Sequence, residues 1–150
     1  MARIEEELVS SFKSEQQKAM LNILFTANWL RSRQVEFFKP FGLSPQQYNI
    51  LRILRGARGE RRSMQQVKQR MIDRAPNATR LTDKLIAKGL VERERCEEDR
   101  RVVYLPIADK GLEMLSRIDR KYANEERFLR SWLNDDEARA LNEHLDRMRG

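Results

Sequence analysis

The sequence predicts a mainly α-helical fold with a small β-hairpin, and three observations support this prediction. Apolar residues recur at helical spacing over most of the chain. Residues 90–107 differ, because two apolar or β-branched runs flank a charged turn there. The length of 150 residues suits one domain that can bury a sizeable core, with or without a dimerising extension. We therefore expect a single domain over residues 1–150.

Residues 4–39 contain neither proline nor glycine and predict one long helix. The helix should end before Pro40, because a residue that precedes proline avoids the helical conformation. One face of this helix is apolar over its whole length, which is more than a small domain can cover. We therefore expect residues 4–39 to contribute to a subunit interface.

Two capping patterns mark the next helices. Ser44 is followed by a proline and then by Gln47, which predicts a helix from residue 45 to about Gly56. Ser63 with Gln66 predicts the start of a third helix.

The segment that follows, residues 76–89, predicts an amphipathic helix. Pro76 suits the first helical position, and Gly89 ends the segment. The predicted helix has about 13 residues and a length of roughly 20 Å. One side carries an apolar stripe, and the other carries hydrogen-bond donors and basic side chains. Such a helix fits a DNA major groove, although on periodicity alone a hydrated surface helix is the commoner explanation.

Residues 90–107 predict a hairpin packed behind this helix. Apolar residues open the first strand, residues 102–105 are β-branched, aromatic and apolar, and the charged residues 97–101 form the turn. A short strand at 61–62 is expected to pair with the hairpin. Helices, a turn, a basic helix and then a hairpin follow the order of a winged helix-turn-helix.

Two more helices complete the chain. Residues 109 to about 130 carry apolar residues on one side. Asn134 and Glu137 then predict the capped start of a last helix, which runs to about residue 149.

The run from residue 79 to residue 115 resembles the MarR family of transcription regulators. The shared pattern is a recognition helix ending in Leu-x-x-x-Gly-Leu-Val, a wing with Asp-x-Arg, and a return into a long helix. These parts are Leu85 to Val91, Asp99 to Arg101, and Ile107 to Gly111. The sequence departs from the family at Ala108, where a threonine often caps the long helix.

The resemblance implies an architecture and a mode of action. It implies a winged-helix DNA-binding lobe at about residues 44–107. The helices at about residues 4–39 and 109–149 would interlock two subunits of a homodimer.

The charge distribution points to a polyanionic partner. The net charge is +7, and residues 55–101, with 14 basic and 8 acidic side chains, account for +6 of it. Localised positive charge of this kind favours phosphate binding with counterion release. Net charge that served only solubility would not need to be concentrated.

The candidate DNA-binding residues lie in the third helix, the basic helix and the wing. They are Ser63, Gln65, Arg74, Asn77, Thr79, Arg80, Lys84, Arg95, Asp99, Arg100 and Arg101. Arginine and asparagine can pair with base edges in the major groove, whereas the other donors more often meet phosphates. For Asp99 and Arg101, the resemblance implies that the arginine enters a minor groove and the aspartate holds it. Helix capping explains Ser63 equally well, and a hydrated hairpin tip is the alternative for the wing.

A small-molecule effector is a further implication of the resemblance. Many relatives bind phenolic or aromatic acids in a cleft between the dimerising helices and the DNA-binding lobe. Trp29, Phe37, Phe41 and Tyr48 are candidates to line such a cleft. Aromatic residues at helical spacing are nevertheless more often part of the core.

Other classes of function find little support. His144 is the only histidine, and neither a metal site, a phosphate loop nor a catalytic constellation is visible, so we expect no enzyme and no cofactor. Cys96 is the only cysteine, which excludes a disulfide within the chain. The oxidant-sensing relatives carry their reactive cysteine near the N-terminus instead. The start of the chain has no signal-peptide pattern, and no apolar run suggests a membrane span, so we expect a cytoplasmic protein.

The sequence thus predicts a dimeric regulator that binds a pseudopalindromic operator in double-stranded DNA. Repression is the expected mode, with a small aromatic or phenolic ligand as its modulator. The alternative is a winged-helix module for protein interaction, or for RNA, without sequence-specific DNA binding.

Overall fold

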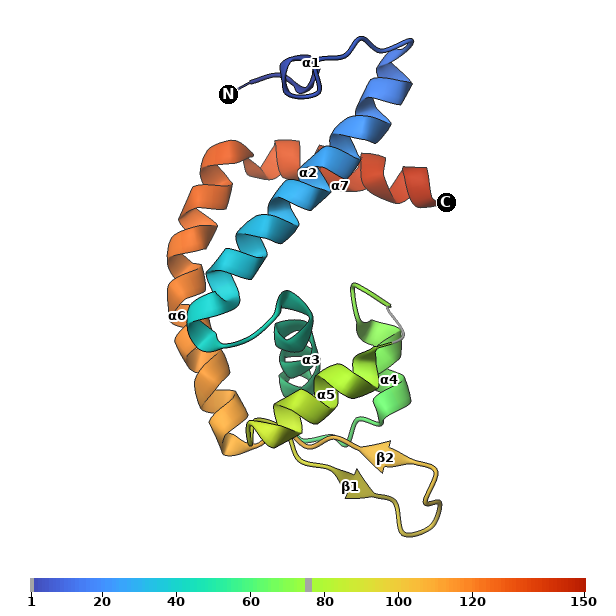
Figure 1. Cartoon of the computed structure of the whole chain (residues 1–150), viewed down its shortest axis with the longest axis vertical. Helices are drawn as coiled ribbons and strands as arrows, with labels where there is room; N and C mark the ends of the chain where they lie inside the picture. Colours follow the sequence, from blue (N-terminus) through green and yellow to red (C-terminus); the bar gives the residue numbers. More distant parts are fainter. Residues whose placement is uncertain (1, 75–76) are drawn as a thin grey trace.

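The computed structural model of the protein describes residues 2–74 and 77–150 (Figure 1). The elements are α1 (Ile4–Glu7), α2 (Glu15–Phe38), the 3-10 helix η1 (Lys39–Phe41), α3 (Pro45–Gly56), α4 (Met64–Arg70), α5 (Ala78–Ala87), β1 (Glu94–Arg95), β2 (Val103–Tyr104), α6 (Asp109–Trp132) and α7 (Asp135–Arg149). The predicted fold class is confirmed: the described part of the chain is mainly α, with one small antiparallel hairpin.

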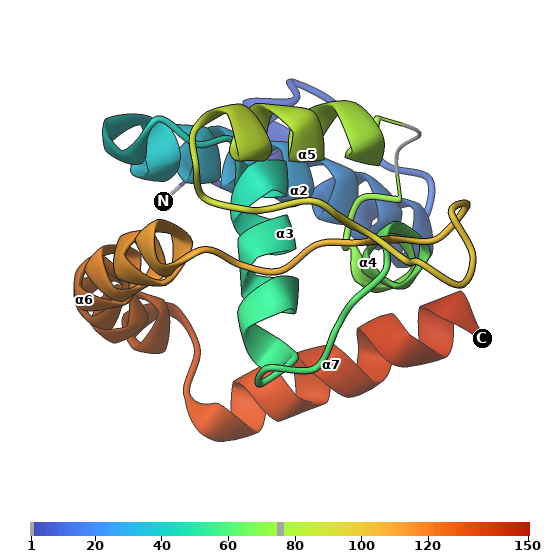
Figure 2. The ribbon, with the colours of Figure 1, turned by 90° about the horizontal axis from the view of Figure 1, so that it is seen from below.

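Helix α3 stands at the centre of the molecule, where it contacts α2, α4, α5 and α6 (Figure 2). Its residues Ile50, Leu51 and Leu54 are buried in the core. The core also takes fully buried side chains from α4, α5, the hairpin and the first half of α6: Val67, Leu85, Leu105, Leu115 and Ile118. Beyond this core, α2 and the second half of α6 extend away from α3, and α7 follows α6 after a sharp turn (Figure 1).

The prediction of one continuous helix over residues 4–39 is wrong. Helix α1 ends at Glu7, and α2 begins only at Glu15. Between them Val9 has a positive φ of 48°, and the Ser14 hydroxyl accepts a hydrogen bond from the Gln17 amide at 3.1 Å. The Ser14 cap stabilises a new helix start, so the chain can leave the helical conformation before it. The prediction missed this break because it considered only proline and glycine as helix breakers.

The predicted caps of α3 and α4 are confirmed. The Ser44 hydroxyl accepts from the Gln47 amide at 3.1 Å, and the Gln47 side chain accepts from the Ser44 amide at 2.9 Å. Ser63 and Gln66 make the same reciprocal pair at 3.2 and 2.9 Å. Helix α3 ends at Gly56, as the sequence predicts.

The hairpin has shorter strands than the sequence predicts. Its ladder pairs Glu94 with Tyr104 and Arg95 with Val103, and a separate bridge joins Val91 to Ile107. Pro106 lies between these two pairings and has no amide hydrogen to donate, so the ladder is interrupted there. The strand expected at residues 61–62 does not form; an isolated β-bridge and one backbone hydrogen bond stand in its place. Ser63 pairs with Tyr104, and the Leu105 amide donates to the Arg62 carbonyl at 3.0 Å.

The last two helices begin as predicted. Ala108 occupies the N-cap of α6 and makes no side-chain capping bond. One turn later, Gly111 packs so closely on the hairpin that a Cβ atom there would overlap the Leu90 carbonyl. Asn134 and Glu137 form the predicted capping box of α7, in which no described residue is buried.

Candidate nucleic-acid interface

Helix α5 has one buried face and one exposed face. It spans ten residues rather than about 13, and its first residue is Ala78; Pro76, expected to open it, lies outside the described residues. Ala78, Thr82 and Leu85 are buried against the core. Thr82 is polar although it is buried, and its hydroxyl is satisfied by donating to the Ala78 carbonyl at 2.8 Å.

The exposed face of α5 carries the candidate groove-binding residues. Thr79, Arg80 and Lys84 are exposed, and Arg80 and Lys84 lie one turn apart. Asn77 occupies the N-cap position without making a side-chain capping bond, so its amide group is not used by the helix. Within residues 2–74 and 77–150, Arg80 and Lys84 form no ion pair. These side chains therefore retain donors for a partner.

The hairpin and its flanks, residues 90–107, are called the wing below. At its tip the Arg101 side chain is 91% exposed but is held by Asp99. The Arg101 backbone amide and Nε both donate to Asp99 Oδ1 at 3.1 Å, and Nη2 donates to Oδ2 at 3.3 Å. These bonds lower the pKa of the Asp99 carboxyl, which therefore stays ionised at neutral pH. The tip thus presents a guanidinium in a defined orientation.

Two ion pairs at the root of the wing were not expected from the sequence. Arg93 Nη2 contacts Asp83 Oδ1 on the exposed side of α5. Glu94 Oε1 lies 2.9 Å from Nη1 of Arg61, whose guanidinium also lies 5.5 Å from the ring centroid of Tyr104. Opposite charges ten or more residues apart carry no periodic signal, so only the folded arrangement reveals these pairs.

The remaining candidate DNA-binding residues lie around these two elements. Gln65, Arg74, Arg95 and Arg100 are exposed. Ser63 is half-buried and uses its hydroxyl oxygen to cap α4, which leaves the hydroxyl hydrogen as a donor.

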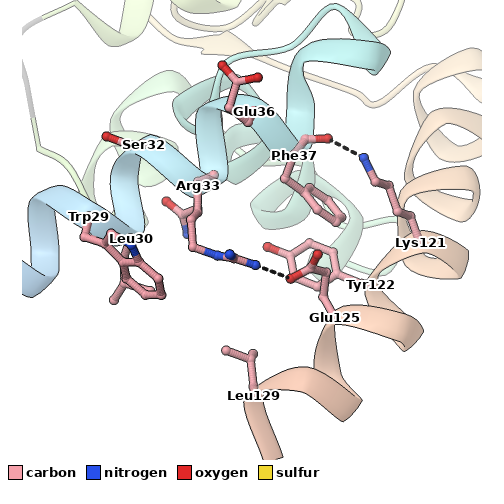
Figure 3. A pocket seen from close by; sticks show the side chains of 11 residues that line it. Trp29, Leu30, Ser32, Arg33, Glu36, Phe37, Lys121, Tyr122, Glu125 and Leu129 are labelled. Carbon is pink, nitrogen blue, oxygen red and sulfur yellow. Dashed lines mark hydrogen bonds and ion pairs between the residues drawn. The ribbon is translucent and has the colours of Figure 1, made fainter. Parts of the chain in front are cut away.

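A cleft of about 570 Å³ opens between α2 and α6 (Figure 3). Trp29 and Phe37 line this cleft, whereas Phe41 and Tyr48 do not. Tyr48 instead stacks on Phe38 with ring centroids 4.4 Å apart. The other lining residues are Leu30, Ser32, Arg33, Gln34, Glu36, Lys121, Tyr122, Glu125 and Leu129.

Two polar contacts span this cleft, and both are drawn in Figure 3. Arg33 Nη2 donates to Glu125 Oε2 at 3.4 Å, and Lys121 Nζ donates to the Phe37 carbonyl at 3.0 Å. Burial raises the pKa of Tyr122, so its phenol stays protonated at neutral pH. The cleft therefore combines aromatic walls with basic and acidic side chains and a neutral hydroxyl group.

The described residues, 2–74 and 77–150, contain neither a cluster of metal-ligating side chains nor a helix suited to span a membrane. Among them, no three histidine, cysteine or acidic side chains lie together so as to hold a metal ion. None of the described helices combines the length and the apolar character that crossing a membrane requires.

Three comparisons place the chain among known proteins. A family model described as the MarR family matches residues 41–102. The uncharacterized HTH-type transcriptional regulator YkoM of Bacillus subtilis (strain 168) is 35% identical over 80 residues, 53% of this chain and 51% of YkoM, so the chain matches only about half of that relative.

Solved structures match over a greater length. The crystal structure of a MarR transcription factor from Planctomyces limnophilus is 34% identical, with a TM-score of 0.70, and the match covers 91% of this chain and 98% of that one. A mutant MarR from E. coli, complexed with operator DNA, shares the fold at 20% identity with a TM-score of 0.74, over 98% of this chain and 99% of that one. The identity and coverage of the first of these structures, together with the family model, show that the chain belongs to the MarR family.

Proposed function

We propose that the protein is a sequence-specific, double-stranded DNA-binding transcription regulator. The arrangement that carries the proposal is the exposed face of α5 beside a wing whose Arg101 is already held by Asp99. A helix with the donors of Asn77, Arg80 and Lys84 suits base edges in the major groove. A fixed guanidinium at a wing tip suits the negative potential of a narrow minor groove. This is a binding role and not a catalytic one.

The roles of the other candidates follow from their exposure. Gln65, Arg74, Arg95 and Arg100 are exposed around α5 and the wing and suit phosphate contacts. Ser63 lies at the N-terminus of α4, where free amides and a hydroxyl favour a phosphate oxygen. The proposed DNA-binding lobe is residues 44–107.

The proposal includes a homodimer formed by the helices outside this lobe. Large apolar side chains are exposed on α2, on the second half of α6, in the turn that follows it and on α7: Met20, Leu24, Val35, Phe128, Leu129, Leu133, Leu141 and Met148. A surface this apolar is unfavourable in water unless another subunit covers it. A twofold dimer would place two α5 helices about one DNA turn apart, roughly 34 Å, on a pseudopalindromic operator. Repression would then follow from occlusion of a promoter by the bound dimer, in the cytoplasm.

An aromatic or phenolic effector in the cleft between α2 and α6 completes the proposal. Trp29, Phe37 and Tyr122 supply ring surfaces, and Arg33 or Lys121 can meet an acidic group. The ligand would act only if it bound more tightly to one spacing of the two lobes than to the other.

The test is fluorescence anisotropy on duplexes selected from a random library, measured over a series of salt concentrations. The native protein is compared with Arg80→Ala and Arg101→Ala. Arg120→Ala serves as control, because it removes an exposed charge from the first half of α6, outside both the proposed DNA-binding lobe and the proposed dimer surface. We expect a selected motif with twofold symmetry. The free energy of DNA binding should become less favourable by about 1–3 kcal/mol in each interface variant and should hardly change in the control.

The opposite result would be unselective binding with all four proteins alike. That outcome would exclude a sequence-specific regulator and favour a winged-helix module for protein interaction.

A further inference from the structure

We propose that Asp83 and Arg93 are positioning residues that set the orientation of the wing relative to α5. The proposal rests on the DNA-binding function proposed above and adds to it a residue pair that holds the two reading elements together.

The ion pairs at the root of the wing come from opposite faces of one short segment. Arg93 reaches Asp83 on α5, and the next residue, Glu94, reaches Arg61 in the connection between α3 and α4. Successive side chains of an extended chain point to opposite faces, so the two pairs hold the segment from both sides. The guanidinium of Arg61 also lies over Tyr104, the residue that faces Glu94 across the ladder.

Apart from these ion pairs, the wing is tied to the chain before α4 through its second strand, by the Ser63–Tyr104 bridge and by the hydrogen bond from the Leu105 backbone amide to the Arg62 carbonyl. Each strand has only two residues, and a hairpin of this size is marginal by itself. The chain enters the wing through Gly89, whose φ of +72° lies in the region that favours glycine. The bridge between Val91 and Ile107 joins the start of the wing to its end. It lies on the far side of Pro106 from the wing tip. On the first strand, the contact of Arg93 with Asp83 lies on the tip side of this interruption, so it bears on where the tip points relative to α5.

A negative charge at Asp83 is unexpected on a helix face that is proposed to bind DNA. It is exposed on α5 between Arg80 and Lys84, on the face proposed to enter the major groove. A carboxylate there repels DNA, so simple electrostatics predicts tighter binding when the charge is removed. If Asp83 instead positions the wing, removing its charge weakens binding. The two accounts thus predict effects of opposite sign for the same substitution.

The experiment measures affinity for the selected duplex with native protein, Asp83→Asn and Asp83→Glu. The control is Glu98→Gln, which removes an exposed carboxylate from the wing. In the described part of the chain, the Glu98 carboxylate forms no ion pair. Each protein is also made with Arg101→Ala. Thermal unfolding of every variant confirms that it folds.

We expect Asp83→Asn to weaken binding about five-fold, the size of effect that one exposed ion pair can supply. Asp83→Glu should restore most of the affinity, and Glu98→Gln should bind as tightly as native protein or more tightly. Arg101→Ala should cost less in the Asp83→Asn background than in native protein, because a misplaced tip has less contact to lose.

Equal or tighter binding by Asp83→Asn would overturn the proposal. So would weaker binding with an undiminished penalty for Arg101→Ala, because Asp83 would then act without the wing. Failure of native protein to select any duplex would instead overturn the DNA-binding function, and with it the role of this pair.

Discussion

The two ends of α6 lie in different surroundings, and the difference divides the molecule. Near its start, Leu115 and Ile118 are fully buried against the core around α3. Near its end, Phe128 and Leu129 are 44% and 43% exposed, and α7 beyond them buries no residue that the structure describes. The amphipathic pattern is the same along the helix, so the pattern alone does not say what covers each part. One chain suffices to bury the first part, and we propose that a second copy buries the other.

The largest expected effect compares two leucines of α6. Leu115→Ala should lower the free energy of unfolding by about 2–5 kcal/mol, because it leaves a cavity in a closed core. Leu129→Ala removes the same atoms from a site that is half open in the single chain. It should change subunit stability little and raise the dimer dissociation constant. Chemical denaturation and analytical ultracentrifugation measure the two effects; equal loss of subunit stability in both variants would contradict the division.

The next comparison uses two glycines. A Cβ at Gly111 would overlap the Leu90 carbonyl and lie 2.9 Å from Cγ1 of Ile107, so Gly111→Ala should cost about 1–3 kcal/mol. Gly56, in α3, has open space around it, and Gly56→Ala should be neutral or stabilise by up to about 1 kcal/mol. Both values come from urea unfolding. A tolerated alanine at position 111 would show that the contact between α6 and the wing is loose.

Two helix N-caps of the same kind test the division between the core and the helices outside it. Ser44 caps α3 in the core, and Asn134 caps α7 outside it, each with a reciprocal partner. Ser44→Ala should lower the stability of the whole fold by about 1 kcal/mol. Asn134→Ala should instead fray α7 and weaken the dimer, with little effect on unfolding of the core. Amide hydrogen exchange distinguishes local from global opening; a global effect from Asn134→Ala would contradict the prediction.

The smallest expected effect is a gain. Ala108 is the N-cap of α6 and contributes no capping bond, so Ala108→Thr should stabilise the fold by about 0.5–1 kcal/mol. For a chain of this size that corresponds to a rise in Tm of roughly 1–4 °C. Calorimetry would show it, and Ala108→Val, which has a similar shape without the hydroxyl, is the matched control. A gain in both variants would assign the effect to packing.

The sequence predicted those parts of the fold that depend on neighbouring residues. The capping boxes at Ser44, Ser63 and Asn134 are local, and each was found where the sequence predicted it. The break before α2 was missed because Ser14 gives a weaker signal than proline or glycine would. The ladder of the wing was predicted too long because Pro106 was not weighed as an interruption.

The candidate site was predictable to a different extent. The exposed face of α5 follows from helical spacing, and the hold of Asp99 on Arg101 was expected only through the family resemblance. Neither source indicated the pairing of Asp83 with Arg93. Such pairs depend on the angle between two elements, which tertiary packing sets and local sequence does not.

The most direct test of the central claim is the stoichiometry of the complex with a selected duplex. Anisotropy is followed while protein is added to duplex at a concentration well above the dissociation constant. The account predicts saturation at two chains per duplex, on two half-sites with centres about one helical turn apart. Saturation at one chain per duplex, or a selected site without twofold symmetry, would contradict it.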